Sequence, residues 1–150
     1  MKIAISQSNY LPWKGYFDLI KNVDEFIFYD EVQFTRRDWR NRNLIRLGDK
    51  KKWITIPILN KGNYYEIISN MKVGQVNWKE LHLNLFKQSY ANSKYFNEIY
   101  EFFKNCFKDI NTDSLSEINI FLIKKICEYL QIKTLFLNSN KIEKAKNNLT

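Results

Sequence analysis

The change of hydrophobic period over the first thirty residues is the feature that most limits the folds open to this chain. Residues 2–6 (KIAIS) form a short apolar run, which is typical of a strand buried on both faces. Residues 14–22 then place apolar side chains at helical spacing, and the aromatic-rich residues 25–30 (EFIFYD) indicate a second strand. The sequence therefore predicts a Rossmann-like β-α-β start, in which the loops after both strands meet at one edge of a parallel sheet.

A strand-like alternation of apolar residues returns in the basic part of the chain. Residues 42–47 and 52–58 alternate on either side of a Gly-Asp pair, which predicts an antiparallel hairpin with a basic tip. Residues 67–73 (IISNMKV) indicate another strand. The sequence is thus typical of the α/β class, with a basic β-hairpin after the β-α-β start.

The second half of the chain has mainly the period of a helix. Apolar side chains recur at helical spacing over residues 78–90 and 96–107, and a third amphipathic helix begins at a capping box formed by Ser114 and Glu117. Residues 134–138 (TLFLN) then indicate one further strand.

Length and composition favour a single globular unit. With 150 residues, of which 45% are hydrophobic, the chain can bury one core. We expect one α/β domain over residues 1–138 and a polar, flexible tail over residues 139–150. No apolar stretch is long enough to cross a bilayer as a helix, and the N-terminus lacks a signal-peptide pattern, so we expect a cytoplasmic location.

The net charge of +8 is concentrated in one segment. Residues 36–53 hold eight Lys or Arg against two Asp, which accounts for six of the eight net charges. No complete nucleic-acid-binding motif accompanies them, so nucleic acid is not the partner that the sequence favours. Because His82 is the only histidine and Cys106 and Cys127 lack CxxC spacing, we expect no metal site and two buried free thiols; the cofactor stays unknown.

The loop after the first predicted strand, SQSNYLPWKGY, carries more chemistry than a turn requires. Pro12 and Gly15 have structural explanations, because proline restricts the chain before a helix and glycine permits close backbone approach. Gln7, Tyr10 and Trp13 are not explained in this way. We expect the two aromatic rings to stack a flat substrate while the helix amides receive an anion.

Residues 29–43 (YDEVQFTRRDWRNRN) form the second polar segment. Asp30, at a strand end, could orient an amine, hold a metal ion or bind a ribose hydroxyl, and Gln33 could read an amide. Arg40 and Arg42 suit two-pronged capture of phosphate or carboxylate, although a solvated hairpin base explains them equally well.

His82 is a candidate general base because histidine titrates near neutrality when it is unperturbed. It lies between Trp78 and Phe86 on the apolar side of its predicted helix. That position favours the competing interpretation, a hydrogen-bonded core residue, and both interpretations stay open.

Two strings, ISQSNYLPWKGYFDLI and FIFYDEVQFTRRDWRNRNLI, resemble the signature of the WbqC-like family, and the similarity continues over nearly the whole chain. Ser8 replaces a family proline, and Glu31 replaces a second Asp. Relatives continue beyond the position of Thr150, so we expect this chain to be the N-terminal part of the family fold. The family motif positions are matched by Gln7, Tyr10, Pro12, Trp13, Gly15, Tyr16, Asp30, Gln33, Arg42, Asn43, His82 and Tyr90.

The resemblance implies transfer of an acyl or aminoacyl group, such as glycyl, onto a sugar in bacterial O-antigen or other surface-polysaccharide synthesis. The implied substrate is a small molecule, either a nucleotide-activated sugar or an acyl donor, with Asp30 orienting the acceptor amine and His82 accepting its proton. Two alternatives stay open: a non-catalytic binder of nucleotide-sugars or nucleic acid, and an inactive, shortened family member. The expected substrate-binding residues are Gln7, Tyr10, Trp13, Gly15, Tyr16, Gln33, Arg40, Arg42, Asn43 and Tyr90.

Overall fold

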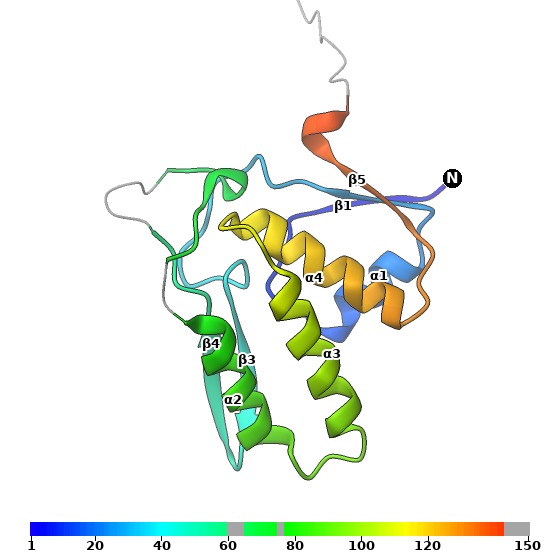
Figure 1. Cartoon of the computed structure of the whole chain (residues 1–150). Coiled ribbons are helices and arrows are strands. Elements are labelled where there is room, and N and C mark those ends of the chain that lie inside the picture. Colours follow the sequence, from blue (N-terminus) through cyan, green and yellow to red (C-terminus); the bar gives the residue numbers. More distant parts are fainter. Residues whose placement is uncertain (60–64, 75–76, 143–150) are drawn as a thin grey trace, which may run out of the picture.

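The computed structural model describes residues 1–59, 65–74 and 77–142, and it confirms the predicted α/β class (Figure 1). The strands are β1 (Ile3–Ser6), β2 (Glu25–Phe28), β3 (Arg42–Leu47), β4 (Lys50–Thr55) and β5 (Leu135–Asn138). The helices are α1 (Lys14–Lys21), α2 (Trp78–Tyr90), α3 (Phe96–Asp109) and α4 (Leu115–Tyr129), with short 3-10 helices η1 (Ile68–Asn70) and η2 (Ser139–Lys141).

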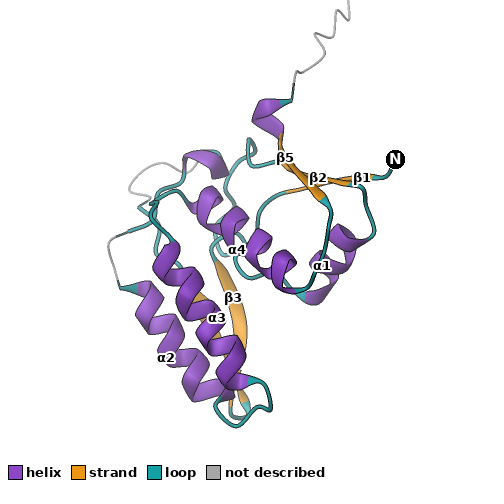
Figure 2. Ribbon diagram, turned by 45° about the vertical axis from the view of Figure 1, so that its right-hand side comes forward, coloured by secondary structure: helices purple, strands orange, loops and turns teal. Residues whose placement is uncertain are grey.

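The predicted β-α-β start is confirmed, and its strands are parallel. β1 pairs with β2, so that Ala4 lies opposite Phe26, and β5 pairs in parallel on the other side of β2 (Figure 2). The side chains of Ala4, Phe26 and Phe28 point to the face that α1 and α4 cover, where they form one hydrophobic core with residues such as Ile20 and Ile123.

The prediction that β1 is buried on both faces is wrong. Ile3 and Ile5 are 46% and 62% exposed, whereas Ala4 between them is buried. The physical reason is the two-residue period of a strand, because α1 and α4 pack on the face that carries Ala4 and leave Ile3 and Ile5 of the edge strand to solvent.

The predicted hairpin is confirmed, and it forms a second core with α2 and α3. β3 and β4 pair antiparallel around Gly48, whose φ of +59° is a conformation that favours glycine. Ile45 and Ile54 face inward toward Trp78 and Phe107, and both figures show α2 and α3 alongside this hairpin. β4 ends at Thr55, earlier than the predicted limit of residue 58.

α4 joins the two cores. Its residues Leu115 and Leu122 belong to the core of the hairpin, whereas Ile123 and Cys127 belong to the core of the parallel sheet. The predicted cap is present, since the Ser114 hydroxyl accepts a hydrogen bond from the backbone N–H of Glu117 at 3.4 Å. The prediction of buried free thiols is also confirmed for both cysteines.

One further expectation about local structure needs correction, and another falls mostly outside the described residues. Residues 67–73 form no strand element but the 3-10 helix η1 flanked by isolated bridges, because Ile68 and Met71 both enter the core at a three-residue spacing. The expected flexible tail begins with η2, and its remainder, residues 143–150, lies outside the described residues.

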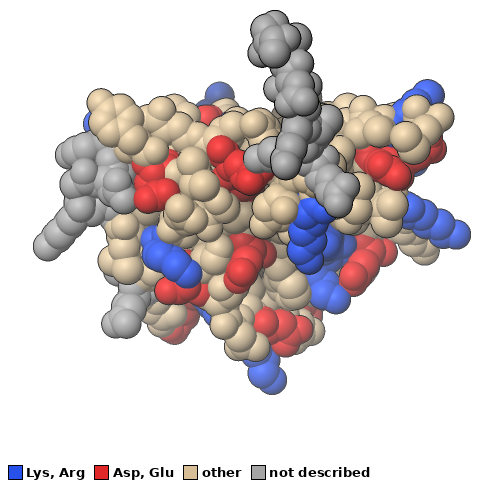
Figure 3. Space-filling model, turned by 90° about the horizontal axis from the view of Figure 1, so that it is seen from above, with Lys and Arg blue, Asp and Glu red and all other residues tan. Residues whose placement is uncertain are grey.

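The face of the molecule seen from above the parallel sheet carries basic and acidic side chains side by side (Figure 3). The basic segment predicted to hold most of the excess charge lies instead on the hairpin and the loop before it. Arg36, Arg37, Arg46 and the three lysines of β4 are all exposed there.

Removing a buried side chain from α4 tests whether this helix holds the cores together. Leu122 is fully buried, so Leu122→Ala should lower the free energy of unfolding by about 2–5 kcal/mol through lost burial and the cavity left behind. The same change at Leu130, which is 50% exposed, should cost less than about 0.5 kcal/mol. Denaturant unfolding measures both values, and equal losses would contradict the assignment.

Candidate functional site

The carboxyl ends of β1 and β2 meet at the buried carboxylate of Asp30. Its Oδ1 accepts the backbone N–H of Ser8 at 2.8 Å, and its Oδ2 accepts the hydroxyls of Ser8, at 2.6 Å, and Ser116. The residue is only 5% exposed. Three donors therefore occupy this carboxylate and tie the opening loop, the end of β2 and the first turn of α4 together.

Ser8 donates two hydrogen bonds that a proline at this position could not donate. It supplies both a backbone N–H and a hydroxyl to Asp30. Proline, the residue that the family resemblance implies at this position, has neither donor. The departure noted in the sequence thus changes how this chain satisfies the buried carboxylate.

Arg40 lies next to this junction and links the two polar loops. Its Nη1 donates to the side-chain oxygen of Asn9 and its Nη2 to that of Gln7, while the carboxylate of Asp38 lies 3.5 Å away. The backbone carbonyl of Arg40 accepts a hydrogen bond from Asn119 at 2.8 Å. Gln7 and Arg40 are therefore in contact, and the Arg40 side chain is 15% exposed.

A cleft of about 310 Å³ opens beside Arg40, and we term it the tryptophan cleft. Trp13 and Trp39, which are 74% and 46% exposed, form part of its wall. The predicted residue Asn43 also lines it and donates to the carbonyl of Leu11. The complete lining is Asn9, Tyr10, Pro12, Trp13, Trp39 and Asn43.

Gly15 positions the indole of Trp13. A Cβ at this glycine would come within 2.1 Å of the Trp13 ring, so only glycine lets the ring lie across the start of α1. The close contact with the Trp13 ring therefore explains why a glycine is required at position 15.

Tyr10 and Tyr16 are part of the core, and the stacking role predicted for the ring of Tyr10 is wrong. Tyr10 is fully buried, edge-on to Trp78, with its hydroxyl 2.7 Å from Nδ1 of His82. Tyr16 is buried and donates to the carbonyl of Gln7 at 2.8 Å, and desolvation raises its pKa. Of the predicted aromatic pair, only Trp13 presents its ring to solvent.

His82 has the surroundings of a hydrogen-bonded core residue. It is 3% exposed and lies beneath Tyr10, with its ring 5.5 Å from that of Trp78. Burial lowers the pKa of His82 to about 4. The imidazole is therefore neutral at pH 7, but the cleft lining does not include it.

Arg42 and Asn43 are neighbours on β3 that point to opposite faces of the hairpin. Asn43 faces the opening loop, whereas the guanidinium of Arg42 lies 3.9 Å above the ring of Trp53 on the outer face. The structure consequently does not bring Arg42 to Gln7 and Arg40.

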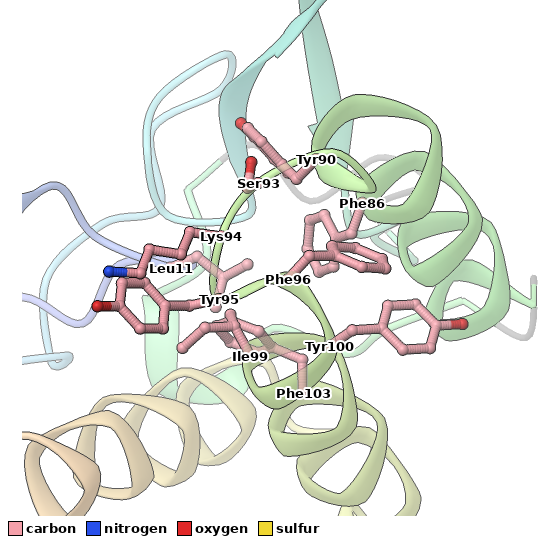
Figure 4. A pocket seen from close by; sticks show the side chains of 10 residues that line it. All are labelled: Leu11, Phe86, Tyr90, Ser93, Lys94, Tyr95, Phe96, Ile99, Tyr100 and Phe103. Atoms are coloured by element: carbon pink, nitrogen blue, oxygen red, sulfur yellow. The ribbon is translucent and has the colours of Figure 1, made fainter.

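Gln33 and Tyr90 also lie away from the tryptophan cleft. Gln33 is exposed and forms a backbone bridge with Ile67. Tyr90 lines a separate apolar pocket of about 330 Å³ at the α2–α3 hairpin, with its hydroxyl accepting from the backbone N–H of Arg46 (Figure 4). The pocket is lined by Leu11, Phe86, Tyr90, Ser93, Lys94, Tyr95, Phe96, Ile99, Tyr100 and Phe103.

Sequence reasoning missed Asn9 and Trp39. Asn9 lies in the loop that was already singled out, and a polar residue among its aromatic neighbours was an available signal. Trp39 stands between Asp38 and Arg40, where a buried tryptophan is not expected, so its position among charges could have indicated a ligand-facing ring. No group of three or more His, Cys, Asp or Glu among the described residues is arranged to hold a metal ion.

The pH dependence of stability tests the burial of His82. The pKa of His82 is about 4 in the folded chain and about 6.5 when unfolded, so between these values the unfolded state binds more protons. The free energy of unfolding should therefore fall by about 3 kcal/mol as the pH decreases from 6.5 to 4. Denaturant unfolding of His82→Gln should show a smaller fall over this window than the parent chain, and an identical fall would overturn the assignment.

Replacing Asp30 tests whether its carboxylate stabilises the fold. Asp30→Asn keeps the shape but exchanges an acceptor oxygen for a donor beside two hydroxyls, so unfolding should become easier by about 1–3 kcal/mol. Asp18→Asn, at a carboxylate that is 57% exposed, is the matched control and should leave stability unchanged. Unchanged stability of Asp30→Asn would show that the network does not depend on the charge.

Comparisons with known proteins agree with this picture at the level of the family. The WbqC-like protein family matches residues 7–150. An uncharacterized protein of Mycobacterium tuberculosis, Rv1507c, is 41% identical over 138 residues, which is 92% of this chain and 60% of that relative. The chain thus spans about three fifths of the length of this curated relative.

No solved structure matches the chain significantly. Within the described residues, every helix is too short or too polar to span a lipid bilayer. The match over residues 7–150, together with the similarity to the mycobacterial protein, shows that this chain belongs to the WbqC-like protein family.

Proposed function

We propose that the tryptophan cleft binds the sugar of a nucleotide-activated sugar, for acyl or aminoacyl transfer of the glycyl type in bacterial O-antigen or other surface-polysaccharide synthesis. The observation that carries the proposal is the pair of exposed indoles, Trp13 and Trp39, in a cleft that also presents the amides of Asn9 and Asn43. An exposed tryptophan is costly to solvate, and two in one hollow are typical of a ligand site.

The chemistry of the cleft suits a sugar. The C–H bonds on one face of a pyranose ring pack against an indole, and its hydroxyls can exchange hydrogen bonds with amide groups. Arg40 supports this lining from outside it, because its guanidinium donates to the side chains of Asn9 and Gln7. Such an arrangement orients a polar ring before reaction, which is a large part of what a transferase must supply.

Asp30 and His82 enter this proposal as positioning residues. Asp30 acts through Ser8, which fixes the loop that carries Asn9. His82 acts through Tyr10, whose backbone N–H donates to the carbonyl of Trp39 at 3.0 Å and so joins the two walls of the cleft. The group that accepts a proton from the acceptor amine is not assigned to either residue.

The second candidate function is a non-catalytic binder of nucleotide-sugars. One specific observation favours it, namely that both predicted acid–base residues, Asp30 and His82, are buried and hydrogen-bonded. Incubating the longer mycobacterial relative with nucleotide-activated amino sugars and candidate acyl donors, followed by mass measurement, separates the two. Sugar binding without any mass increase would favour the binder.

We propose a cytoplasmic location for this activity. Cys106 and Cys127 are both free thiols, which supports a reducing compartment. Fractionation of cells that express the tagged chain tests this location. Recovery of the chain in the membrane or secreted fraction would contradict the proposal.

Truncating one wall of the cleft tests the sugar site. Trp39→Ala should weaken binding of UDP-N-acetylglucosamine about tenfold, because stacking on an aromatic ring contributes about 1–3 kcal/mol. Tyr65→Ala, at an aromatic residue that is 85% exposed and outside the cleft, is the matched control and should bind like the parent. Titration calorimetry measures both, and equal affinities of the two variants would exclude the cleft.

A further inference from the structure

The outer side of the hairpin carries a second polar hollow, which we term the arginine pocket. It has a volume of about 280 Å³ and contains the side chains of three arginines, with the hydroxyl of Thr55 nearby and no carboxylate in its lining. Cationic side chains and a hydroxyl in one small pocket suit an anion as the occupant. The full lining is Phe34, Arg36, Arg37, Asn41, Arg42, Thr55 and Ile58.

Arg42 is fixed at this pocket by two contacts, and one of its N–H donors stays without a partner in the described part of the chain. Its guanidinium lies 3.9 Å above the Trp53 ring, and its Nη2 donates to the carbonyl of Arg37. Its Nε is buried and has no hydrogen-bond partner among the described residues. A planar cation fixed on an aromatic ring is preorganised for phosphate, and an unpaired buried donor requires an explanation.

The backbone at Arg37 is a second unusual feature of the same pocket. Arg37 has a φ of +57°, a left-handed conformation that is uncommon for residues other than glycine. Such conformations recur at ligand sites, where surrounding contacts maintain them. Here the carbonyl of Arg37 is the acceptor for Arg42, so the strained residue and the fixed cation support each other.

A contact between two indole rings links the lining of the tryptophan cleft to Arg42 of the arginine pocket. Trp39 lines the cleft, and its ring lies 5.4 Å from that of Trp53. Trp53 in turn carries Arg42 of the arginine pocket. Ring contacts through Trp53 thus lead from the cleft wall to Arg42, although Arg42 and Asn43 point to opposite faces of β3.

We infer that the arginine pocket binds the diphosphate of a nucleotide-activated sugar whose sugar ring occupies the tryptophan cleft. This inference rests on the proposed function, and it names the part of the substrate that the cleft itself does not hold. Arg36, Arg37 and Arg42, which all line the pocket, take the anion.

A diphosphate fits these observations better than a nucleic-acid strand. A strand needs a basic groove that follows several phosphates in succession. In this chain three arginines line one pocket of about 280 Å³, and the lining of the tryptophan cleft offers amides and indoles.

Titration calorimetry of the whole chain with inorganic pyrophosphate, UDP and UDP-N-acetylglucosamine tests the inference. The variants are Arg36→Gln and Arg37→Asn, the latter because asparagine tolerates the left-handed backbone. Lys51→Gln is the matched control, since it removes one exposed charge from β4 outside the pocket lining. Both arginine variants should bind pyrophosphate and UDP at least tenfold more weakly, whereas the control should change little.

The possible outcomes separate this inference from the sugar site. Equal losses in Lys51→Gln and the arginine variants would show a general charge effect and overturn the inference. Arginine-dependent binding of UDP without any gain from the attached sugar would support the pocket but contradict the proposed function. Sugar binding that depends on Trp39 but not on Arg36 or Arg37 would support the proposed function but contradict the arginine pocket. A single-stranded oligonucleotide that binds more tightly than UDP, with a steep salt dependence, would overturn the diphosphate in favour of nucleic acid.

Discussion

The buried carboxylate of Asp30 is the interaction on which the arrangement of the site depends. A charge removed from water is costly unless donors surround it, and Asp30 meets this requirement with Ser8 from the opening loop and Ser116 from the first turn of α4. The start of a helix also favours a nearby negative charge. These contacts hold the ends of β1 and β2 against α4, and the cleft is built on that support.

From this junction the polar contacts extend outward to the surface. Asn119 of α4 donates both to Ser8 and to the carbonyl of Arg40, so the loop before the hairpin is attached to the same helix. Below the cleft, the Tyr10–His82 hydrogen bond lies within the hydrophobic core and fixes the loop from the other side. Trp13 and Trp39 are thus exposed side chains on a rigid base, which is the condition for selective binding.

The convergence of the two polar loops could be predicted because parallel strands place their carboxyl ends at one edge of a sheet. Which side chains face the cleft could not. In the irregular loop that contains Tyr10 and Trp13 there is no period to tell the buried ring from the exposed one. Arg40 and Arg42 differ for another reason, since Arg40 precedes β3 and turns toward Gln7 while Arg42 follows the alternation of the strand onto Trp53.

The sequence by itself determined the order of strands and helices outside residues 67–73, the hairpin, the cap of α4 and the family, because hydrophobic period and motif residues are local properties. The tertiary structure alone decided that Asp30 and His82 are buried partners of Ser8 and Tyr10, and that Trp39 joins Trp13. Burial and hydrogen bonding at these positions depend on residues far away in the sequence, such as Ser116 and Asn119. A local sequence pattern does not show that these residues contact the two loops.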